Sequence, residues 1–519
     1  MSKVSQTTVI SLVLLIVIAY LPYILQGGSF MIDDWMMIAQ SYFDQSIWKT
    51  FVYWNTVGGG GMRPLGCVFF AVTPTLFGEN PIPYIVINTI CWIAAILLVS
   101  RVCRNYCGIA AAYWFIAIAA VPTIASSTIF EPLVMIIGSA SIVFWALSLW
   151  NIDQYMNSSK ARSAKLIGAY ALALLGLLIY EVSAPLLLII ALLPLAPRIA
   201  PHLEELLYTP QSLYARILSF FRFLCSREFL SELMRCTAPI VTVIAILSLF
   251  QKIIVPLYGV SLSRLSARPI TKMVGSFGRW LFSVVVDTPI MLASSLTHYG
   301  WSLLKRWDWW LLLGGVALFI AAMRKLGQSN NNSITASTLQ HTDDASQRTH
   351  KYTRGVEYYF LFVVALALLA CSSLSVFSGF NMRIEGIENR FLGSTWICLA
   401  ILLGALFARL QRGYTVVIPF VIITAIYFSF MIQAHNYIAN RHLQESVIDD
   451  CVRKIQALPE PMQQGAFIIG NVPVYANNNF NNEVVFAYRH DFGGQLKMRL
   501  RSRTLLDEGQ VVNVNRVAP

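Results

Sequence analysis

The sequence predicts an all-α polytopic membrane protein of about eleven transmembrane helices, with membrane-parallel helices in its first outer loop and a small α+β extracytoplasmic domain at its carboxy terminus. Of its 519 residues, 56% are hydrophobic and only 12% are charged, whereas soluble proteins carry about 25% charged residues. Apolar runs close to the roughly 20 residues that a spanning helix needs recur along residues 1–434. Residues 435–519 lack such runs and form the predicted carboxy-terminal domain.

The apolar runs define the predicted spans. The stretch from Leu166 to Pro197 is too long for one span, so we expect two helices joined by a tight turn at Tyr180 and Glu181. A single long, kinked helix is the alternative, and it would invert the sidedness of everything downstream. The predicted spans are residues 7–25, 82–100, 108–125, 131–150, 166–180, 182–197, 236–258, 308–323, 356–378, 394–410 and 414–434.

Basic residues between the spans predict the topology. Segments rich in Lys and Arg all face the cytoplasm if the amino terminus is inside and the chain turns at Tyr180, as the positive-inside rule requires. The first loop, the loop before residue 394 and the tail then lie outside. The net charge of +12 is expected to face anionic lipid headgroups, and no nucleic-acid partner is predicted. The basic segments are residues 101–107, 151–165, 198–235, 324–354 and 409–412.

Three regions do not fit the pattern of spans. Residues 259–307 are basic although they would face outside, so we expect a surface-lying or re-entrant element there. Residues 326–353 are rich in Ser, Asn, Thr and Gln and are expected to form a mobile cytoplasmic loop. In the tail, the last helix is expected to continue from His435 to Leu458, followed by short strands. There, the alternating Lys497, Arg499, Arg501 and Arg503 would share one strand face.

The first outer loop, residues 28–81, holds the most informative residues. Asp33 and Asp34 directly follow the first span, and carboxylates beside a bilayer are costly and usually functional. Asp44 lies farther along the same loop. Four consecutive glycines follow, but without the Lys-Ser/Thr of a phosphate loop they indicate a hinge. The apolar stretch 65–77 is short for a span and suits a membrane-parallel helix.

Five features in order resemble the GT-C membrane glycosyltransferases that use polyprenyl-phosphate sugars. They are a first transmembrane helix, an acidic pair, Arg63-Pro64-Leu65, a surface helix ending in Leu76-Phe77-Gly78 before Asn80-Pro81, and a span with an early Asn88. The resemblance is close over about the first 100 residues and otherwise architectural. The most similar members are the bacterial serotype-converting O-antigen glucosyltransferases. The resemblance implies transfer of a hexose such as glucose from a polyprenyl-phosphate donor to a lipid-linked or lipopolysaccharide glycan. The anomeric centre of the sugar would be inverted.

The resemblance also implies roles for particular residues and places the active site and carboxy terminus on the periplasmic side of the bacterial inner membrane. A carboxylate of the first outer loop, Asp33 or Asp34, would be the general base, and the choice between them stays open. Arginines suit the lipid phosphate because their forks bind it through two hydrogen bonds. Glu131 could equally cap a helix. The implied phosphate contacts are Arg390, Arg383 and Arg63, and the implied substrate-pocket residues are Glu131, Glu181, Asp44 and His298.

The sequence predicts no metal centre and leaves two alternative functions open. The nine cysteines are scattered without metal-site spacing, so no metal centre is predicted, while assistance from a divalent cation stays open. A transporter or flippase for lipid-linked oligosaccharide is one alternative, although the internal repeats of many transporters are not evident. A polymerase or ligase of such oligosaccharides is the other.

Overall fold

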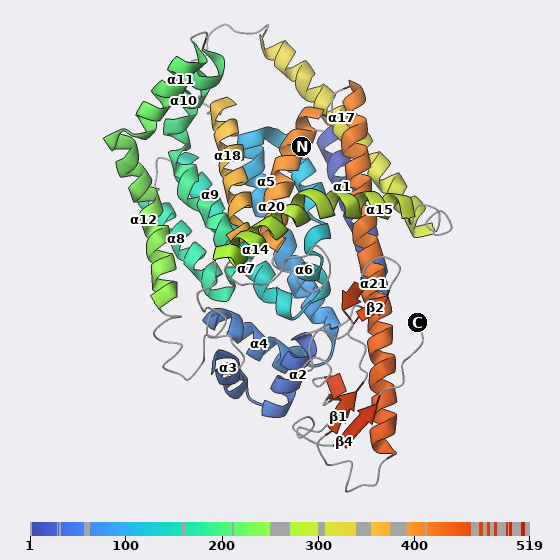
Figure 1. Ribbon diagram of the computed structural model, residues 1–519. Coiled ribbons are helices and arrows are strands. Elements are labelled where there is room, and N and C mark those ends of the chain that lie inside the picture. The colour runs from blue at the N-terminus through green and yellow to red at the C-terminus, as the bar shows by residue number, and fades with distance from the viewer. Residues whose placement is uncertain are drawn as a thin grey trace.

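The protein is a bundle of long helices with three short helices gathered at one end (Figure 1). Ten helical segments are long and apolar enough to cross a membrane, which makes this a multi-pass membrane protein. The computed structural model describes residues 3–27, 30, 33–56, 63–157, 162–209, 212–249, 270–298, 307–338, 354–373, 392–410 and 413–457, and, in the tail, 467–470, 475–477, 482–484, 495–496, 498–500 and 510–513.

The first half of the chain supplies the short helices of the first loop and six of the apolar segments. Its helices are α1 (Lys3–Leu25), α2 (Asp33–Asp44), α3 (Ile47–Thr56), α4 (Pro64–Phe77), α5 (Pro81–Ala119), η2 (Thr123–Ala125), α6 (Ser127–Phe130), α7 (Val134–Asn157), α8 (Arg162–Ile179), η3 (Glu181–Leu186), α9 (Leu187–Leu192), η4 (Leu193–Leu195), α10 (Ala196–Tyr208), α11 (Leu213–Leu224) and α12 (Arg227–Leu249).

The second half supplies the remaining helices and four short strands. Strands β1 and β4 pair in parallel, and β2 and β3 pair antiparallel. The elements are α14 (Ile270–Phe282), η7 (Ser283–Asp287), α15 (Thr288–His298), α17 (Trp307–Thr338), α18 (Arg354–Ala370), α20 (Gly393–Leu410), η9 (Gly413–Val416), α21 (Val417–Gln456), β1 (Phe467–Gly470), β2 (Tyr475–Asn477), β3 (Asn482–Val484) and β4 (Gln510–Asn513).

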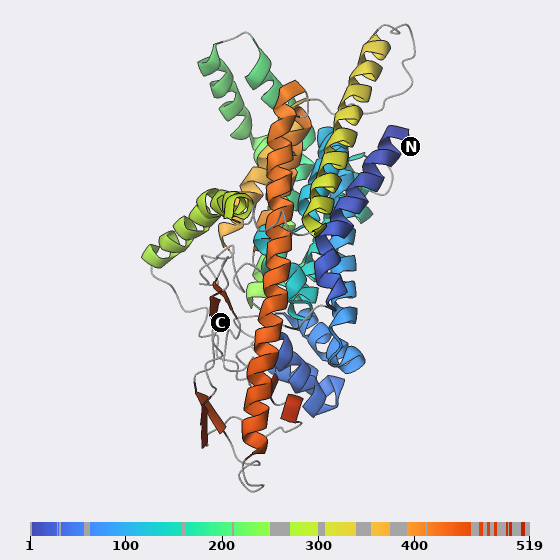
Figure 2. The same ribbon diagram turned by 90° about the vertical axis from the view of Figure 1, so that its right-hand side faces the viewer.

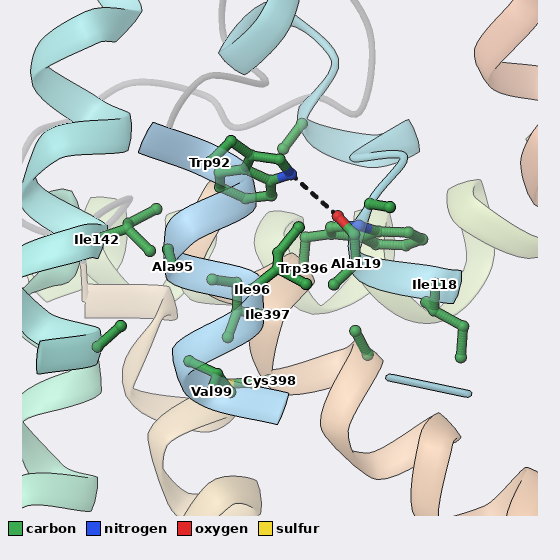
Figure 3. Close-up of a cluster of buried hydrophobic side chains, with 14 of the residues drawn as sticks. Trp92, Ala95, Ile96, Val99, Ile118, Ala119, Ile142, Trp396, Ile397 and Cys398 are labelled. Carbon is green, nitrogen blue, oxygen red and sulfur yellow. Dashed lines mark hydrogen bonds between the residues drawn. The ribbon is translucent and has the colours of Figure 1, made fainter. Parts of the chain in front are cut away.

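Helix α5 covers two of the predicted spans because the chain folds back at Gly108. This glycine has φ 89° and ψ 169°, a conformation that side chains disfavour. The indole Nε1 of Trp92 donates a hydrogen bond to the Ala119 carbonyl at 3.1 Å (Figure 3). In a straight helix these residues would lie about 40 Å apart. The predicted spans 82–100 and 108–125 are therefore two passes that lie side by side.

The predicted turn at Tyr180 is confirmed. Ser148 Oγ donates to the Ala169 carbonyl on α8 at 2.7 Å, and Ser141 Oγ donates to the Tyr180 carbonyl at 2.7 Å. Trp145 Nε1, which lies between these two serines on α7, donates to the Leu186 carbonyl at 2.9 Å. Position along α7 therefore rises with the residue number after Tyr180 and falls with it before Tyr180. Only a chain reversal gives this pattern, so a single long helix is excluded.

The basic segments gather at one end of the bundle and the first loop lies at the other. Asn105 Nδ2 donates to an Asp153 carboxylate oxygen at 2.9 Å, which joins the first two basic segments. The rings of Tyr106 and Phe360 stack there, with their centroids 4.9 Å apart. The basic ends of α10, α17, α18 and α20 lie at this same end in Figure 1, opposite α2, α3 and α4. This grouping is the one that the loop charges predict.

Two expectations for the middle of the chain have different outcomes. Residues 271–297 are long and apolar enough to span a membrane, yet α14 and α15 run across the bundle, at a steep angle to α17 and α21 (Figure 1). Such an orientation fits the surface-lying or re-entrant element. The predicted mobile loop 326–353 is wrong for residues 326–338, which continue α17. Propagating an established helix costs little when no proline interrupts it. Residues 339–353 lie outside the described part.

The tail departs from its prediction. Helix α21 has 40 residues, about 60 Å, or twice the hydrocarbon thickness of a bilayer, so the predicted helical extension is confirmed. Figure 2 shows it running past the bundle with the strands beside it. Two-stranded pairs are marginal on their own, and a separate α+β domain is not supported. The predicted basic strand is wrong at Arg499, because residues 498–500 are helical.

Candidate functional site

An ion pair fastens the first loop to the chain turn at Tyr180. The Arg63 guanidinium donates from Nε to Glu181 Oε2 at 2.7 Å and from Nη2 to Oε1. Its central carbon lies 4.2 Å from the centre of the Tyr180 ring. A Cβ added to Gly66 would lie 2.5 Å from the Ile179 carbonyl oxygen, so only glycine allows α4 this close to the turn. Two predicted site residues, far apart in sequence, thus meet.

The pairing changes what Arg63 can do. The two-pronged contact with the carboxylate uses two of the five N–H donors of the guanidinium, from its Nε and Nη2 edge. Side chains of Arg63 and Glu181 are 28% and 34% exposed, so the pair is accessible from solvent. In this conformation Arg63 positions α4, and Glu181 is its anchor.

Asp34 is buried and holds the start of α7. Its carboxylate Oδ1 accepts a hydrogen bond from the Val134 backbone N–H at 2.9 Å, and none of the residue is exposed. The first N–H groups of a helix have no partner within the helix, and a carboxylate there is also favoured by the helix dipole. Asp34 therefore connects the first loop to a helix that begins 100 residues later.

Asp33 is the first residue of α2. The side chain of Asp33 lies outside the described part of the structure.

Glu131 is fully buried between α6 and α7. Its carbonyl accepts the Met135 N–H at 3.0 Å, so its backbone takes part in starting α7. Asn88 supports the same turn: its Nδ2 donates to the Thr128 carbonyl, and its Oδ1 accepts from Ser139 Oγ. The backbone contact is compatible both with a place in the substrate-pocket wall and with a capping role, so the role of the Glu131 carboxylate stays a prediction.

Asp44 serves the first loop itself. Its Oδ2 accepts hydrogen bonds from Gln40 Nε2 at 2.8 Å and Thr50 Oγ1 at 3.3 Å, which joins α2 to α3. Burial and then the negative charge of Asp44 raise the pKa of Tyr53 above its ordinary value. These contacts give Asp44 a part in the structure of the first loop, and its place in a substrate pocket stays a prediction.

The other predicted site residues are not placed. Arg383 and Arg390 lie outside the described residues, and His298 ends α15 with its side chain also outside the described part. Among the described residues, no group of three His, Cys, Asp or Glu side chains is arranged to hold a metal ion.

A pocket of about 150 Å³ lies where the first loop, α21 and the tail meet. It is lined by Trp35, the residue after Asp34, and by Arg441, Gln444 and Glu445 on the protruding half of α21. Sequence reasoning missed these α21 residues. The sequence predicts that the last helix continues with polar residues beyond its apolar span. It does not show which part of the chain packs against this extension.

Comparisons of the chain with models of known protein families, with curated proteins and with solved structures found no match.

Proposed function

We propose that this protein is an inverting membrane glycosyltransferase, which moves a hexose such as glucose from a polyprenyl-phosphate donor to a cell-surface glycan. The observation that carries the proposal is the anchoring of the acidic first-loop helix. Asp34 is buried against the start of α7, and the Arg63–Glu181 pair holds α4 against the turn at Tyr180. A loop tied down at two points, 100 and 118 residues away in sequence, can present Asp33 at a constant position.

Loop charge gives the proposed orientation. The basic end faces the cytoplasm by the positive-inside rule, so the first loop and the protruding half of α21 face the periplasm of a bacterial inner membrane. Polyprenyl-linked sugars and cell-surface glycans can both reach a site at that face.

In the proposed reaction Asp33 is the general base and Asp34 is a positioning residue. Asp33 takes the proton of the acceptor hydroxyl while that oxygen attacks the anomeric carbon of the donor. The bond from the anomeric carbon to the phosphate oxygen breaks, and the lipid phosphate leaves with the electron pair. Attack opposite the leaving group inverts the anomeric centre. A positioned base contributes about 10²- to 10⁴-fold to such a reaction.

Arginine is the proposed partner of the leaving phosphate. Arg390 and Arg383 lie outside the described residues, and their role stays a prediction from the sequence. Arg63 donates two of its five N–H groups to Glu181, so a phosphate contact would use its other N–H groups or replace Glu181.

The test is transfer of labelled glucose from polyprenyl-phosphate glucose to lipopolysaccharide by the purified protein in nanodiscs. The proposal predicts a covalently labelled glycan and loss of the label in Arg390→Gln. Transport of the lipid-linked sugar across vesicle membranes without any covalent transfer would instead identify a flippase, and label appearing in longer polymers would identify a polymerase.

A further inference from the structure

The pocket beside Trp35 is assembled from three parts of the chain that are far apart in sequence. Phe30 and Trp35 come from the first loop, Gln444 comes from α21, and Gln495 and Arg499 come from the tail. Leu496, next to Gln495, is fully buried, so this part of the tail is packed against the rest of the protein. The tail residues that line the pocket are therefore part of the packed structure.

The charges that line the pocket cancel. Arg441 and Arg499 are matched by Glu79 and Glu445. Arg441 Nε donates to Glu445 Oε1 at 2.9 Å, and Arg441 Nη1 donates to the carbonyl of Gln26 at 3.1 Å. A free phosphate or a metal cation would meet no net opposite charge here, so a neutral ligand fits better.

Two aromatic rings lie among these polar groups. Phe30 and Trp35 meet edge to face with centroids 5.4 Å apart. Aromatic faces contact apolar surface, while amides, carboxylates and guanidinium groups exchange hydrogen bonds. A lining that combines both kinds of group suits a ligand with apolar ring faces and many hydroxyls at its edge.

Gln495 supplies an independent observation. Only 2% of this residue is exposed, and its side-chain oxygen has no hydrogen-bond partner among the described residues. The indole N–H of Trp35, which lines the same pocket, is also buried and has no hydrogen-bond partner within the described residues. Buried polar groups are nearly always satisfied, and an exception calls for an explanation. A hydroxyl can donate to the glutamine oxygen and accept from the indole N–H.

We propose that this pocket binds one neutral sugar ring, a pyranose unit of the acceptor glycan. A cavity of about 150 Å³ has room for one six-membered ring. The binding of a sugar ring is argued from the pocket alone. Only the statement that this sugar belongs to the acceptor glycan rests on the proposed function. The neighbouring Trp35 would bring the bound sugar next to the acidic pair.

Saturation-transfer NMR on the full-length protein in nanodiscs tests the proposal with methyl α-glucoside and methyl α-rhamnoside as probes and glycerol as the non-ring polyol. We expect saturable binding of at least one glycoside and none of glycerol. Arg499→Gln, at an exposed residue, and Gln495→Met should each weaken binding at least fivefold. Arg453→Gln is the matched control, because Arg453 is 76% exposed near the end of α21 and does not line the pocket.

Absence of binding by both glycosides, or equal binding by wild type and Arg499→Gln, would overturn the proposal. Thermal unfolding of each variant identifies loss of fold, and Arg499→Gln keeps the test valid if Gln495→Met unfolds. Glycoside binding without sugar transfer would refute the proposed function and leave the pocket assignment standing. Transfer without glycoside binding would do the reverse.

Discussion

The two ends of the bundle use their polar residues differently. At the basic end, the Arg409–Glu357 pair has side chains 47% and 26% exposed, and solvent-exposed pairs of this kind stabilise proteins by about 0–1 kcal/mol. At the first-loop end, Asp34, Glu131 and Asn88 are fully buried. Burying such groups is unfavourable unless they are bonded. The Arg409–Glu357 pair is therefore a surface contact, while the buried groups at the first-loop end make contacts that fix a particular geometry.

The largest stability effect should come from Asp34. In Asp34→Ala the α7 amide loses its side-chain acceptor inside the protein, and we expect a loss of about 1–3 kcal/mol. Asp34→Asn should lose less, because asparagine caps helices about as well as aspartate. Thermal unfolding in detergent measures both variants. A wild-type melting temperature for Asp34→Ala would contradict the capping role.

Breaking the Arg63–Glu181 pair and crowding the backbone at Gly66 should both have intermediate effects. Arg63→Met and Glu181→Gln should each destabilise by about 1–2 kcal/mol, since hydrogen bonds to charged groups contribute about this much. The double variant should lose less than the sum, because both single changes remove the same contact. Strict additivity in denaturant titrations of the three variants would show that the two residues act independently.

Gly66 tests the close packing of α4. In Gly66→Ala the added Cβ would lie 2.5 Å from the Ile179 carbonyl oxygen. Overpacking of this kind costs about 1–3 kcal/mol, so we expect the variant to be less stable by this amount. Gly314→Ala is the matched control because nothing lies within 4 Å of its added Cβ, and alanine there should be neutral or stabilise the helix by up to about 1 kcal/mol. Equal melting temperatures for the two variants would count against a tight contact at Gly66.

The smallest effect is expected at the basic end. Arg409→Gln should change the free energy of unfolding by less than about 1 kcal/mol, because its ion pair is exposed. The measurement is the same thermal unfolding. A loss as large as that of Asp34→Ala would remove the contrast between the two ends.

The lengths of the apolar runs and the helical character of the residues after them predicted two parts of the fold. The turn at Tyr180 followed from an apolar run too long for one span, and the extension of α21 followed from continued helical character after the last span. The helical conformation of residues 326–338 at the polar end of α17 was not predicted. Serine and asparagine are common in loops, but they can also continue a helix that begins earlier in the chain.

The site was predictable in its residues and hardly in its contacts. Asp34 and Glu181 are predicted from their position beside apolar runs and Arg63 from the resemblance of the first loop, but their partners lie 100 or 118 residues away. No local pattern records such distant pairings. For the same reason, the sequence does not predict that Arg441, Gln495 and Arg499 line one pocket.

Sugar transfer by Asp33→Asn and Asp34→Asn in nanodiscs, with melting temperatures recorded on the same samples, tests the central claim most directly. We predict that Asp33→Asn lowers the transfer rate at least 100-fold with an unchanged melting temperature. We also predict that Asp34→Asn, which keeps a capping side chain, retains a measurable rate. Full activity of Asp33→Asn beside an inactive but stably folded Asp34→Asn would contradict the division of roles between the two aspartates.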